Sequence, residues 1–377
     1  MRGVIHLTGG GGAAEFERAF EFAKRQLRAL IERHPGFYPM YTAAGRWQHA
    51  GEAWTHWCDG FLPGMLWIVY SRQPPGSSEA SWWREQAIRY SRPLEPRKLD
   101  RTVHDLGFLF MSSYYRWYRS APDPDLKAVL VEAGRTMARR FQERGAYLHS
   151  FLAPDSLFID IIMNVGVIFL AARETGDRAL FDIAMRHCHT TRRVLVRGDG
   201  STAHEGLFDL ETGEFLRQST QQGYRADSCW SRGLAWALYG FGAAYAATRD
   251  PLLLETAEAC AGYYIRRTPP DGIPPWDYDA PAEPWLVDTS AAAIAASGFF
   301  QLSDLVADAA RRHFYREVGG HILGTLCRDW LAESDPHWEG ILKGGVYHVH
   351  KRLGVNESVM WGEYFFLEAL GNSVSMC

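Results

Sequence analysis

A carboxylate lies inside a strongly apolar run of this chain. Residues 156–172 read SLFIDIIMNVGVIFLAA, and Asp160 is flanked there by isoleucines. Moving an ionised carboxylate from water into an apolar environment is costly unless something compensates it. Asp160 therefore either caps the start of a helix or is kept partly protonated for chemistry, and both possibilities are open at this point.

A second carboxylate follows His104 at the start of another apolar run, residues 104–118. Asp105 and Asp160 precede neighbouring buried segments, so they can face one another. Two carboxylates in an apolar wall have pKa values that are pushed apart, and one of them holds a proton near neutrality. This suits general acid–base chemistry. Because its flanks are apolar, we expect Asp160 to be the more desolvated member and the proton carrier, with Asp105 orienting it or the substrate.

The segments that must position these residues fall into two alternating kinds. Six are amphipathic with a charged face, as expected for helices with one wet side: 13–31, 79–90, 124–141, 178–195, 252–266 and 305–315. Six are apolar nearly all round, as expected for buried helices: 59–70, 104–118, 160–172, 230–247, 288–302 and 360–370. Strand signals are sparse, and no long linker separates domains.

This alternation predicts an all-α fold, an (α/α)6 barrel in which six inner helices are shielded by six outer ones. We expect one domain over residues 1–377. Each outer helix returns the chain to the same end, so the inner helices run parallel and their N-termini converge. Convergent N-termini present free backbone N–H groups and the positive ends of helix dipoles. One end of the barrel is thus suited to an anion.

Polar residues gather at the predicted starts of the inner helices. They are Asp59, His104 with Asp105, Asp160, Trp230 with Arg232, Asp288, and Trp361 with Glu363. N-capping explains any one of these aspartates alone. Together they predict a funnel of carboxylates, an arginine and tryptophans, which is typical of a carbohydrate pocket. The 14 Trp and 17 Tyr fit this, although aromatic residues also fill cores.

The composition argues against several classes of partner. A net charge of -4, from 40 basic and 44 acidic residues, gives no footprint for nucleic acid. The first twelve residues are too weakly apolar for a signal peptide and no segment reads as membrane-spanning, so we expect a cytoplasmic protein. The six cysteines lack metal-ligand spacing and there is no phosphate loop, so we expect neither a metal nor a cofactor. The oligomeric state is not indicated.

Several long motifs, in order between about residues 54 and 370, resemble the unsaturated glucuronyl hydrolases of glycoside hydrolase family 88. The motifs are HDLGFLF at 104–110, FIDIIMNVGVIFLAA at 158–172, LVRGDGSTAH at 195–204, QQGYRADSCWSRGLAWALYGF at 221–241, WDYDAP at 276–281, DTSAAAIAASG at 288–298, and YHVHKRLGVNESVMWGEYFFLEAL at 347–370.

The resemblance implies an (α/α)6 barrel that removes a 4,5-unsaturated uronic acid from the non-reducing end of oligosaccharides left by polysaccharide lyases. The C4=C5 enol ether is hydrated, with water as the only co-substrate. By motif, Asp160 is the general acid/base and Asp105 its essential neighbour. The predicted substrate-binding residues are Trp57, His104, His204, Gln222, Arg232 and Trp236.

The residues themselves leave alternatives open. Arg232 suits bidentate pairing with the substrate carboxylate, or it forms an ion pair with Asp227 or Asp288. Trp57 and Trp236 stack on sugar rings or belong to the core, and without the resemblance His204 reads as a surface histidine.

The chain also departs from the family pattern. Gln221 stands where the family commonly has histidine, which affects the expected substrate preference, and residues 144–156, just before Asp160, match poorly. Three rivals are an unsaturated rhamnogalacturonyl hydrolase acting on pectin fragments, a sugar epimerase or isomerase on the same barrel, and a carbohydrate-binding protein with a dead site. An epimerase relies on paired histidines, and His187 with His189 and His348 with His350 lie mostly outside the inner-helix starts.

Overall fold

Six inner helical units form a closed ring. The computed structural model describes residue 5 and residues 11–49, 54–283 and 285–373. The inner units are α2 (Phe61–Ser71), α4 (Leu106–Phe110) with α5 (Tyr114–Ser120), α7 (Ile161–Asn164) with α8 (Gly166–Thr175), α10 (Ser231–Thr248), α12 (Thr289–Leu305) and α14 (Met360–Ser373). Each unit contacts the next, and α14 closes the ring against α2. Most of the first twelve residues lie outside the described part, so the expectation about a signal peptide stays a prediction.

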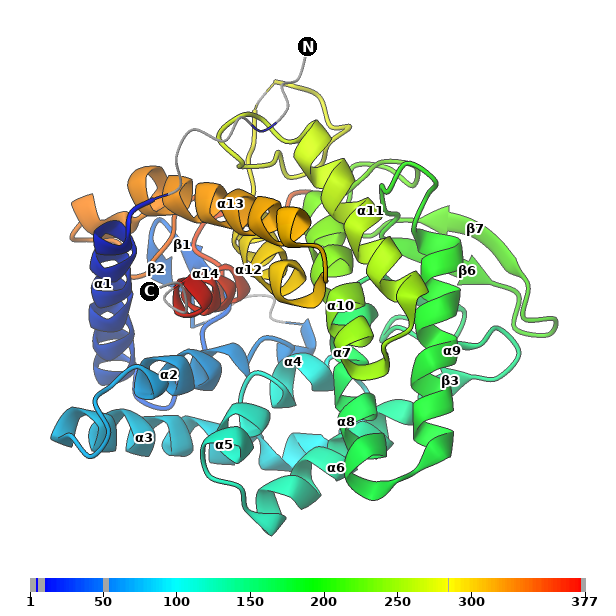
Figure 1. The fold of residues 1–377 in the computed structure, drawn as a ribbon, viewed down its shortest axis with the longest axis horizontal. Helices are drawn as coiled ribbons and strands as arrows, with labels where there is room; N and C mark the ends of the chain where they lie inside the picture. Colours follow the sequence, from blue (N-terminus) through cyan, green and yellow to red (C-terminus); the bar gives the residue numbers. More distant parts are fainter. Residues whose placement is uncertain (1–4, 6–10, 50–53, 284, 374–377) are drawn as a thin grey trace.

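A second set of helices surrounds this ring (Figure 1). It consists of α1 (Ala13–Arg33), α3 (Ser78–Ser91), α6 (Pro124–Ala138), α9 (Arg178–Leu195), α11 (Pro251–Arg267) and α13 (Ala309–Thr325). Each outer helix packs on an inner unit next to it in the ring. The predicted all-α (α/α)6 barrel is confirmed.

Two details differ from the prediction. The last outer helix begins at Ala309, because Asp308 caps it by accepting from the N–H of Arg311, and it extends to Thr325. The second inner helix is broken between α4 and α5. There the hydroxyls of Ser112 and Ser113 donate to carbonyl oxygens four residues earlier. Such bonds bend helices.

Small antiparallel sheets, which the sequence did not indicate, hold loops around the barrel. They are β1 (Thr42–Ala43) with β2 (Arg46–Trp47), β3 (Phe141–Gln142) with β4 (Tyr147–Leu148), β5 (Ser156–Phe158) with β6 (Glu205–Phe208) and β7 (Phe215–Ser219), and β8 (Gly345–His348) with β9 (Leu353–Glu357). Short 3-10 helices span Trp54–His56, Arg92–Leu99 and Ala332–Ser334, and a π-helical turn spans Leu326–Trp330. β5 leads into Asp160, and β7 ends shortly before Gln221.

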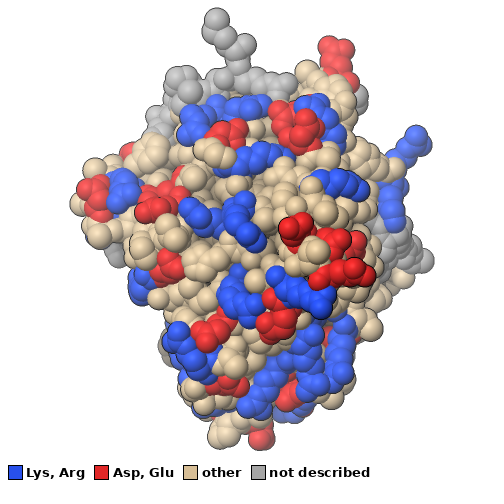
Figure 2. Space-filling view, turned by 90° about the vertical axis from the view of Figure 1, so that its right-hand side faces the viewer, with Lys and Arg blue, Asp and Glu red and all other residues tan. Residues whose placement is uncertain are grey.

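Charged side chains of both signs cover the outer helices. Figure 2 shows one face of the molecule, on which Lys and Arg side chains lie among Asp and Glu side chains. The ion pairs include Arg186 with Glu143 at 2.7 Å and Arg311 with Glu258 at 2.8 Å. Such exposed pairs contribute little to stability individually. The mixture is what the near-balanced charge of the chain predicts.

Helices approach closely where glycine faces a neighbouring backbone. A Cβ atom on Gly134 of α6 would lie 2.5 Å from the carbonyl oxygen of Val167 in α8. A Cβ atom on Gly320 of α13 would meet nothing within 4 Å. Backbone cannot yield as a flexible side chain can, so contact with it limits residue 134 to glycine.

We expect Gly134→Ala to lower the free energy of unfolding by about 1–3 kcal/mol, because the added methyl group forces α6 and α8 apart. Gly320→Ala is the matched control, since its methyl group fits and alanine is favoured over glycine in helices by about 1 kcal/mol. Urea unfolding of both variants measures the difference. Equal stability of the two variants would contradict this account of the packing.

Candidate functional site

A pocket of about 190 Å³ lies at the starts of the inner helices. All but one of the predicted site residues line it: Trp57, His104, Asp105, Asp160, Gln222, Arg232 and Trp236. The remaining one, His204, is not among the lining residues. The parallel inner helices therefore bring together side chains that are up to 179 positions apart in the chain, from residue 57 to residue 236.

Asp160 occupies the N-cap position of α7, but its carboxylate accepts no capping hydrogen bond. Its Oδ1 is buried and has no hydrogen-bond partner in the described part of the chain. Burial raises the pKa of Asp160 from 3.8 to about 7, and the positive charge of Arg232 opposes part of that rise. The capping explanation is therefore wrong. Near neutral pH this carboxyl group can both give and take a proton.

Asp105 occupies the N-cap position of α4, also without a capping hydrogen bond from its side chain. Burial raises the pKa of Asp105 well above its usual range, and the nearby Asp160 carboxylate adds to the rise. The Asp105 side chain is 5% exposed, against 14% for Asp160. The expectation that Asp160 is the more desolvated member is therefore wrong. Ile159 and Ile161, the apolar neighbours of Asp160, belong to the core, so their presence does not indicate how far the Asp160 carboxylate is exposed to solvent.

His104 lies between the two carboxylates. Its Nε2 is 3.3 Å from Oδ1 of Asp105 and 3.6 Å from Oδ1 of Asp160. The backbone N–H of Phe151 donates to Nδ1 over 2.9 Å, which assigns the ring proton to Nε2, facing the carboxylates. Burial, with the charge of Arg140 as a second cause, lowers the pKa of His104 well below its usual value. The neutral imidazole therefore turns its Nε2–H group toward both carboxyl groups.

Arg232 lies under the pocket wall and is 1% exposed. Its Nη1 is 3.5 Å from Oδ2 of Asp288, and its Nη2 donates to the carbonyl oxygen of Tyr347 and to Oε1 of Gln222. Burial lowers the pKa of Arg232 to about 10, so it stays charged at neutral pH. Of the two proposed ion pairs, the one with Asp288 forms, while Asp227 pairs with a surface arginine.

His204 supports a loop of the pocket instead of lining it. Its Nδ1 accepts from the backbone N–H groups of Gln221 (3.0 Å) and Gln222 (3.2 Å). Gln221 lines the pocket and donates from Nε2 to the buried Glu205, which also accepts from Ser156. His204 thus holds the loop that carries Gln221 and Gln222 through Nδ1, and its contact with substrate stays a prediction.

Aromatic rings form the floor of the pocket. Trp57 is half-buried and lies 4.8 Å from the ring of Trp361, between centroids, and 5.4 Å from Phe108. Trp236 is almost fully buried and packs on Phe108 at 5.0 Å. The half-exposed ring of Trp57 is the one placed to stack on a sugar, whereas Trp236 belongs mainly to the core.

The predicted ring of carboxylates is only partly correct. Asp59 lies beside Arg97, at 3.8 Å, and does not line the pocket. Asp288 caps α12 by accepting from the N–H of Ser290. Glu363 accepts from two backbone N–H groups of residues 341 and 342. These three carboxylates serve the fold, so Asp105 and Asp160 are the pair left facing the pocket.

Other lining residues come from segments that the sequence analysis set aside. β8 and the turn after it contribute Tyr347, His348 and Lys351. The stretch before Asp160, residues 144–156, contributes Phe151 and Leu152 to the wall. The family motif at 347–370 could have pointed to the first group, although His348 lies outside the inner-helix starts, whereas residues 144–156 matched the family motifs poorly.

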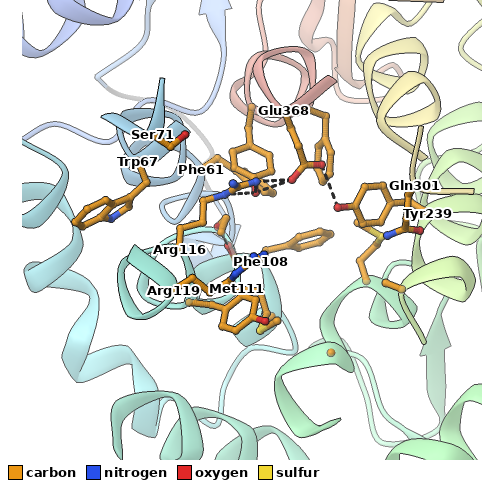
Figure 3. Close-up of a pocket in the computed structure, with 18 of the residues that line it drawn as sticks. Phe61, Trp67, Ser71, Phe108, Met111, Arg116, Arg119, Tyr239, Gln301 and Glu368 are labelled. Carbon is orange, nitrogen blue, oxygen red and sulfur yellow. Dashed lines mark hydrogen bonds and ion pairs between the residues drawn. The ribbon is translucent and has the colours of Figure 1, made fainter. Parts of the chain in front are cut away.

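A second cavity of about 550 Å³ lies toward the opposite ends of the inner helices (Figure 3). At its centre the Glu368 carboxylate accepts from Arg116 (2.5 Å), Tyr239 (3.0 Å), Tyr364 (3.2 Å) and Ser297 (2.5 Å). A carboxylate that accepts four hydrogen bonds has no free lone pair to offer a reaction. The smaller pocket, with its underbonded carboxylates, is therefore the candidate active site.

No group of three or more His, Cys, Asp or Glu side chains is arranged to hold a metal ion within the described residues. In the same part of the chain, no helix combines the length and the apolar character that crossing a bilayer requires.

A helical barrel with two protonatable carboxylates among aromatic rings in one open end is the arrangement of a glycoside hydrolase. The comparisons agree: the family model for Glycosyl Hydrolase Family 88 matches residues 38–265. The chain is 33% identical to the unsaturated glucuronyl hydrolase of Bacillus sp. (strain GL1), covering 84% of this chain and 85% of that protein. The chain belongs to glycoside hydrolase family 88.

Solved structures resemble the whole barrel. An unsaturated glucuronyl hydrolase specific for heparin matches with a TM-score of 0.88 at 29% identity, covering 97% of this chain and 98% of the other. A substituted form of the unsaturated glucuronyl hydrolase from Streptococcus agalactiae, solved in complex with dGlcA-GalNAc6S, matches with a TM-score of 0.78 at 26% identity, over 99% and 97% of the two chains.

The raised pKa of Asp160 predicts a pH-dependent gain in stability for Asp160→Asn. Because the folded pKa, about 7, exceeds the ordinary 3.8, the contribution of this group is full below about pH 4 and is lost as pH rises through 7. Neutral asparagine removes that loss. We expect the variant to be more stable than wild type at pH 8, by at most about 4 kcal/mol, and equal to it near pH 4. Thermal unfolding across this range measures the effect, and a gain that is constant with pH would contradict it. Asp227→Asn, at an exposed position, is the control.

Arg232→Ala should lower stability by about 3–5 kcal/mol, because it leaves Asp288 buried beside no cation. It should also raise the pKa of Asp160 further, since Arg232 opposes that rise. Arg232→Lys keeps the charge and should recover most of the stability. Chemical unfolding measures the stability of both variants, and their Michaelis constants measure substrate binding. Together these measurements distinguish a structural role of Arg232 from binding of the substrate carboxylate. Unchanged stability with a raised Michaelis constant would instead assign Arg232 to the substrate carboxylate.

Proposed function

We propose that this protein releases a 4,5-unsaturated uronic acid from the non-reducing end of lyase-generated oligosaccharides by hydrating the C4=C5 enol ether. The observation that carries the proposal is the Asp160 carboxyl group, which has a pKa near neutrality and no capping bond, beside Asp105 and a neutral His104. The names of the relatives, which are unsaturated glucuronyl hydrolases, support this proposal.

The reaction needs an acid that is protonated at working pH yet strong enough to protonate carbon. Asp160 gives its proton to C4, and the positive charge that develops at C5 is met by water. The Asp160 carboxylate takes a proton from that water as the C5–O bond forms. The product is a hemiketal, which opens to a C5 ketone and a C1 hemiacetal that loses the aglycone as an alcohol. The net reaction consumes one water molecule and returns Asp160 to its protonated form.

The neighbours of Asp160 have supporting roles in this scheme. Asp105, whose pKa is raised well above its usual range, stays protonated and offers a hydrogen bond to Asp160 or the substrate. His104 directs its Nε2–H at both carboxyl groups and keeps them in place. Gln222, fixed by Arg232, presents its amide to the pocket. Trp57 offers a ring face to the sugar, and water is the only co-substrate, with no cofactor in the scheme.

The same proposal covers the extent of the catalytic domain and the class of substrate. Residues 1–377 act as one catalytic domain, and the substrate is an oligosaccharide ending in an unsaturated glucuronic acid. The relatives named for glucuronyl substrates favour this over the rhamnogalacturonyl alternative. An epimerase or isomerase is less well supported, because the relatives are named as unsaturated glucuronyl and unsaturated chondroitin disaccharide hydrolases. A cytoplasmic location remains a prediction from the sequence.

The first test follows the ultraviolet absorbance of the C4=C5 bond in a panel of unsaturated disaccharides. Wild type should remove the absorbance, whereas Asp160→Asn should lose at least about 1,000-fold in kcat, because asparagine cannot transfer a proton. Asparagine is also a good N-cap residue, so the fold should be kept. Activity of wild type should decline as pH rises above 7, where Asp160 loses its proton. Near-normal turnover by Asp160→Asn would refute the assigned role.

A further inference from the structure

Helix α4 is capped by a residue from another inner helix. Its N-cap residue is Asp105, and an N-cap side chain ordinarily accepts from the N–H of the second or third helical residue. The third residue of α4 is Phe108, whose N–H has no acceptor within the helix. Asp105 does not bond it. Instead Oδ1 of Asn164, at the end of α7, accepts from Phe108 N–H over 2.7 Å.

The amide nitrogen of Asn164 binds the backbone of Asp160, the second carboxylate residue of the pair. Its Nδ2 donates to the backbone carbonyl oxygen of Asp160 over 3.1 Å, and the whole side chain is buried. Gly107 allows this reach, since a Cβ atom there would lie 2.3 Å from Cα of Asn164. The two helix starts are thus in backbone contact, with one amide joining them.

We propose that Asn164 is a positioning residue that caps α4 in place of Asp105 and ties the first turn of α4 to Asp160. By satisfying Phe108 N–H, it leaves the Asp105 carboxylate free to face Asp160 and His104. The inference rests on the proposed function for its catalytic consequence, although the geometry of the cap is independent of it.

Removing Asn164 would leave a buried N–H group without an acceptor. Such a group is costly, so the structure would supply another acceptor. Asp105 is the nearest one by sequence, because it already occupies the N-cap position. Its carboxylate would turn away from Asp160 to accept a hydrogen bond from Phe108 N–H. This would separate the two catalytic carboxyl groups and leave the ring of Trp57 in place.

Crystal structures and steady-state kinetics of Asn164→Ala and Asn164→Asp test this. In Asn164→Ala, the Asp105 carboxylate should be found on Phe108 N–H, and kcat should fall about 100-fold, as expected for a misplaced catalytic group. The Michaelis constant should change less than about threefold, since binding groups stay in place. Protonated aspartate can reproduce both amide bonds, so Asn164→Asp should keep Asp105 in its native position and retain more of kcat.

Ser91→Ala is the matched control for general destabilisation. Ser91 is fully buried and also joins two groups, Trp67 Nε1 and the carbonyl oxygen of Ala87, but it does not line the pocket. An unmoved Asp105 in Asn164→Ala, or a kcat no lower than that of Ser91→Ala, would overturn the inference. If wild type itself fails on every unsaturated disaccharide, the proposed function fails, while the position of Asp105 in the variant still decides the capping role.

Discussion

The structure depends on holding two carboxyl groups out of water at helix starts that they do not cap. An N-terminal turn offers N–H groups that would bind a carboxylate, lower its pKa and stabilise the helix. Asp105 and Asp160 both occupy such positions without taking those bonds. The arrangement costs stability, which the closed ring of helices and the charge of Arg232 offset. In return, two carboxyl groups can hold protons at positions where a capping carboxylate would be ionised.

The same chain shows what a carboxylate becomes when it is fully bonded. Glu368, in the cavity at the other end of the barrel, accepts four hydrogen bonds and joins α14 to its neighbours (Figure 3). Asp288 and Glu363 likewise accept from backbone N–H groups, and Asp288 is also paired with Arg232. Burial alone therefore does not mark a catalytic acid. Among the described residues, Asp160 is distinguished by a buried Oδ1 that has neither a hydrogen-bond donor nor an arginine paired with it.

Much of the fold can be predicted from the sequence, because the residue pattern of each helix indicates whether the helix is buried or exposed on one side. Apolar residues on all sides identify inner helices, and one charged face identifies outer ones, so the double ring could be predicted, with its largest boundary error at the end of α13. The two aspartates could also be predicted. Their order of burial could not, because the cover over Asp105 and Asp160 comes from distant segments such as Phe151 and Tyr347. The contacts of His204 with the N–H groups of residues 221 and 222 could not be predicted for the same reason, since the pairing of β6 with β7 brings these residues to it.

The catalytic carboxyl groups and the residues around the mouth of the pocket come from different parts of the fold. The acid pair comes from rigid inner helices, whereas Phe151, Gln221, His348 and Lys351 come from loops and small sheets around the mouth. Loop segments change more readily than packed helices, because fewer buried contacts constrain them. Gln221 is an exception, since Glu205 fixes its amide by a hydrogen bond. A glutamine held in one orientation presents a defined amide oxygen to the pocket. We therefore expect a substitution at this position to affect which hydroxyl pattern is accepted more than the proton transfer at Asp160.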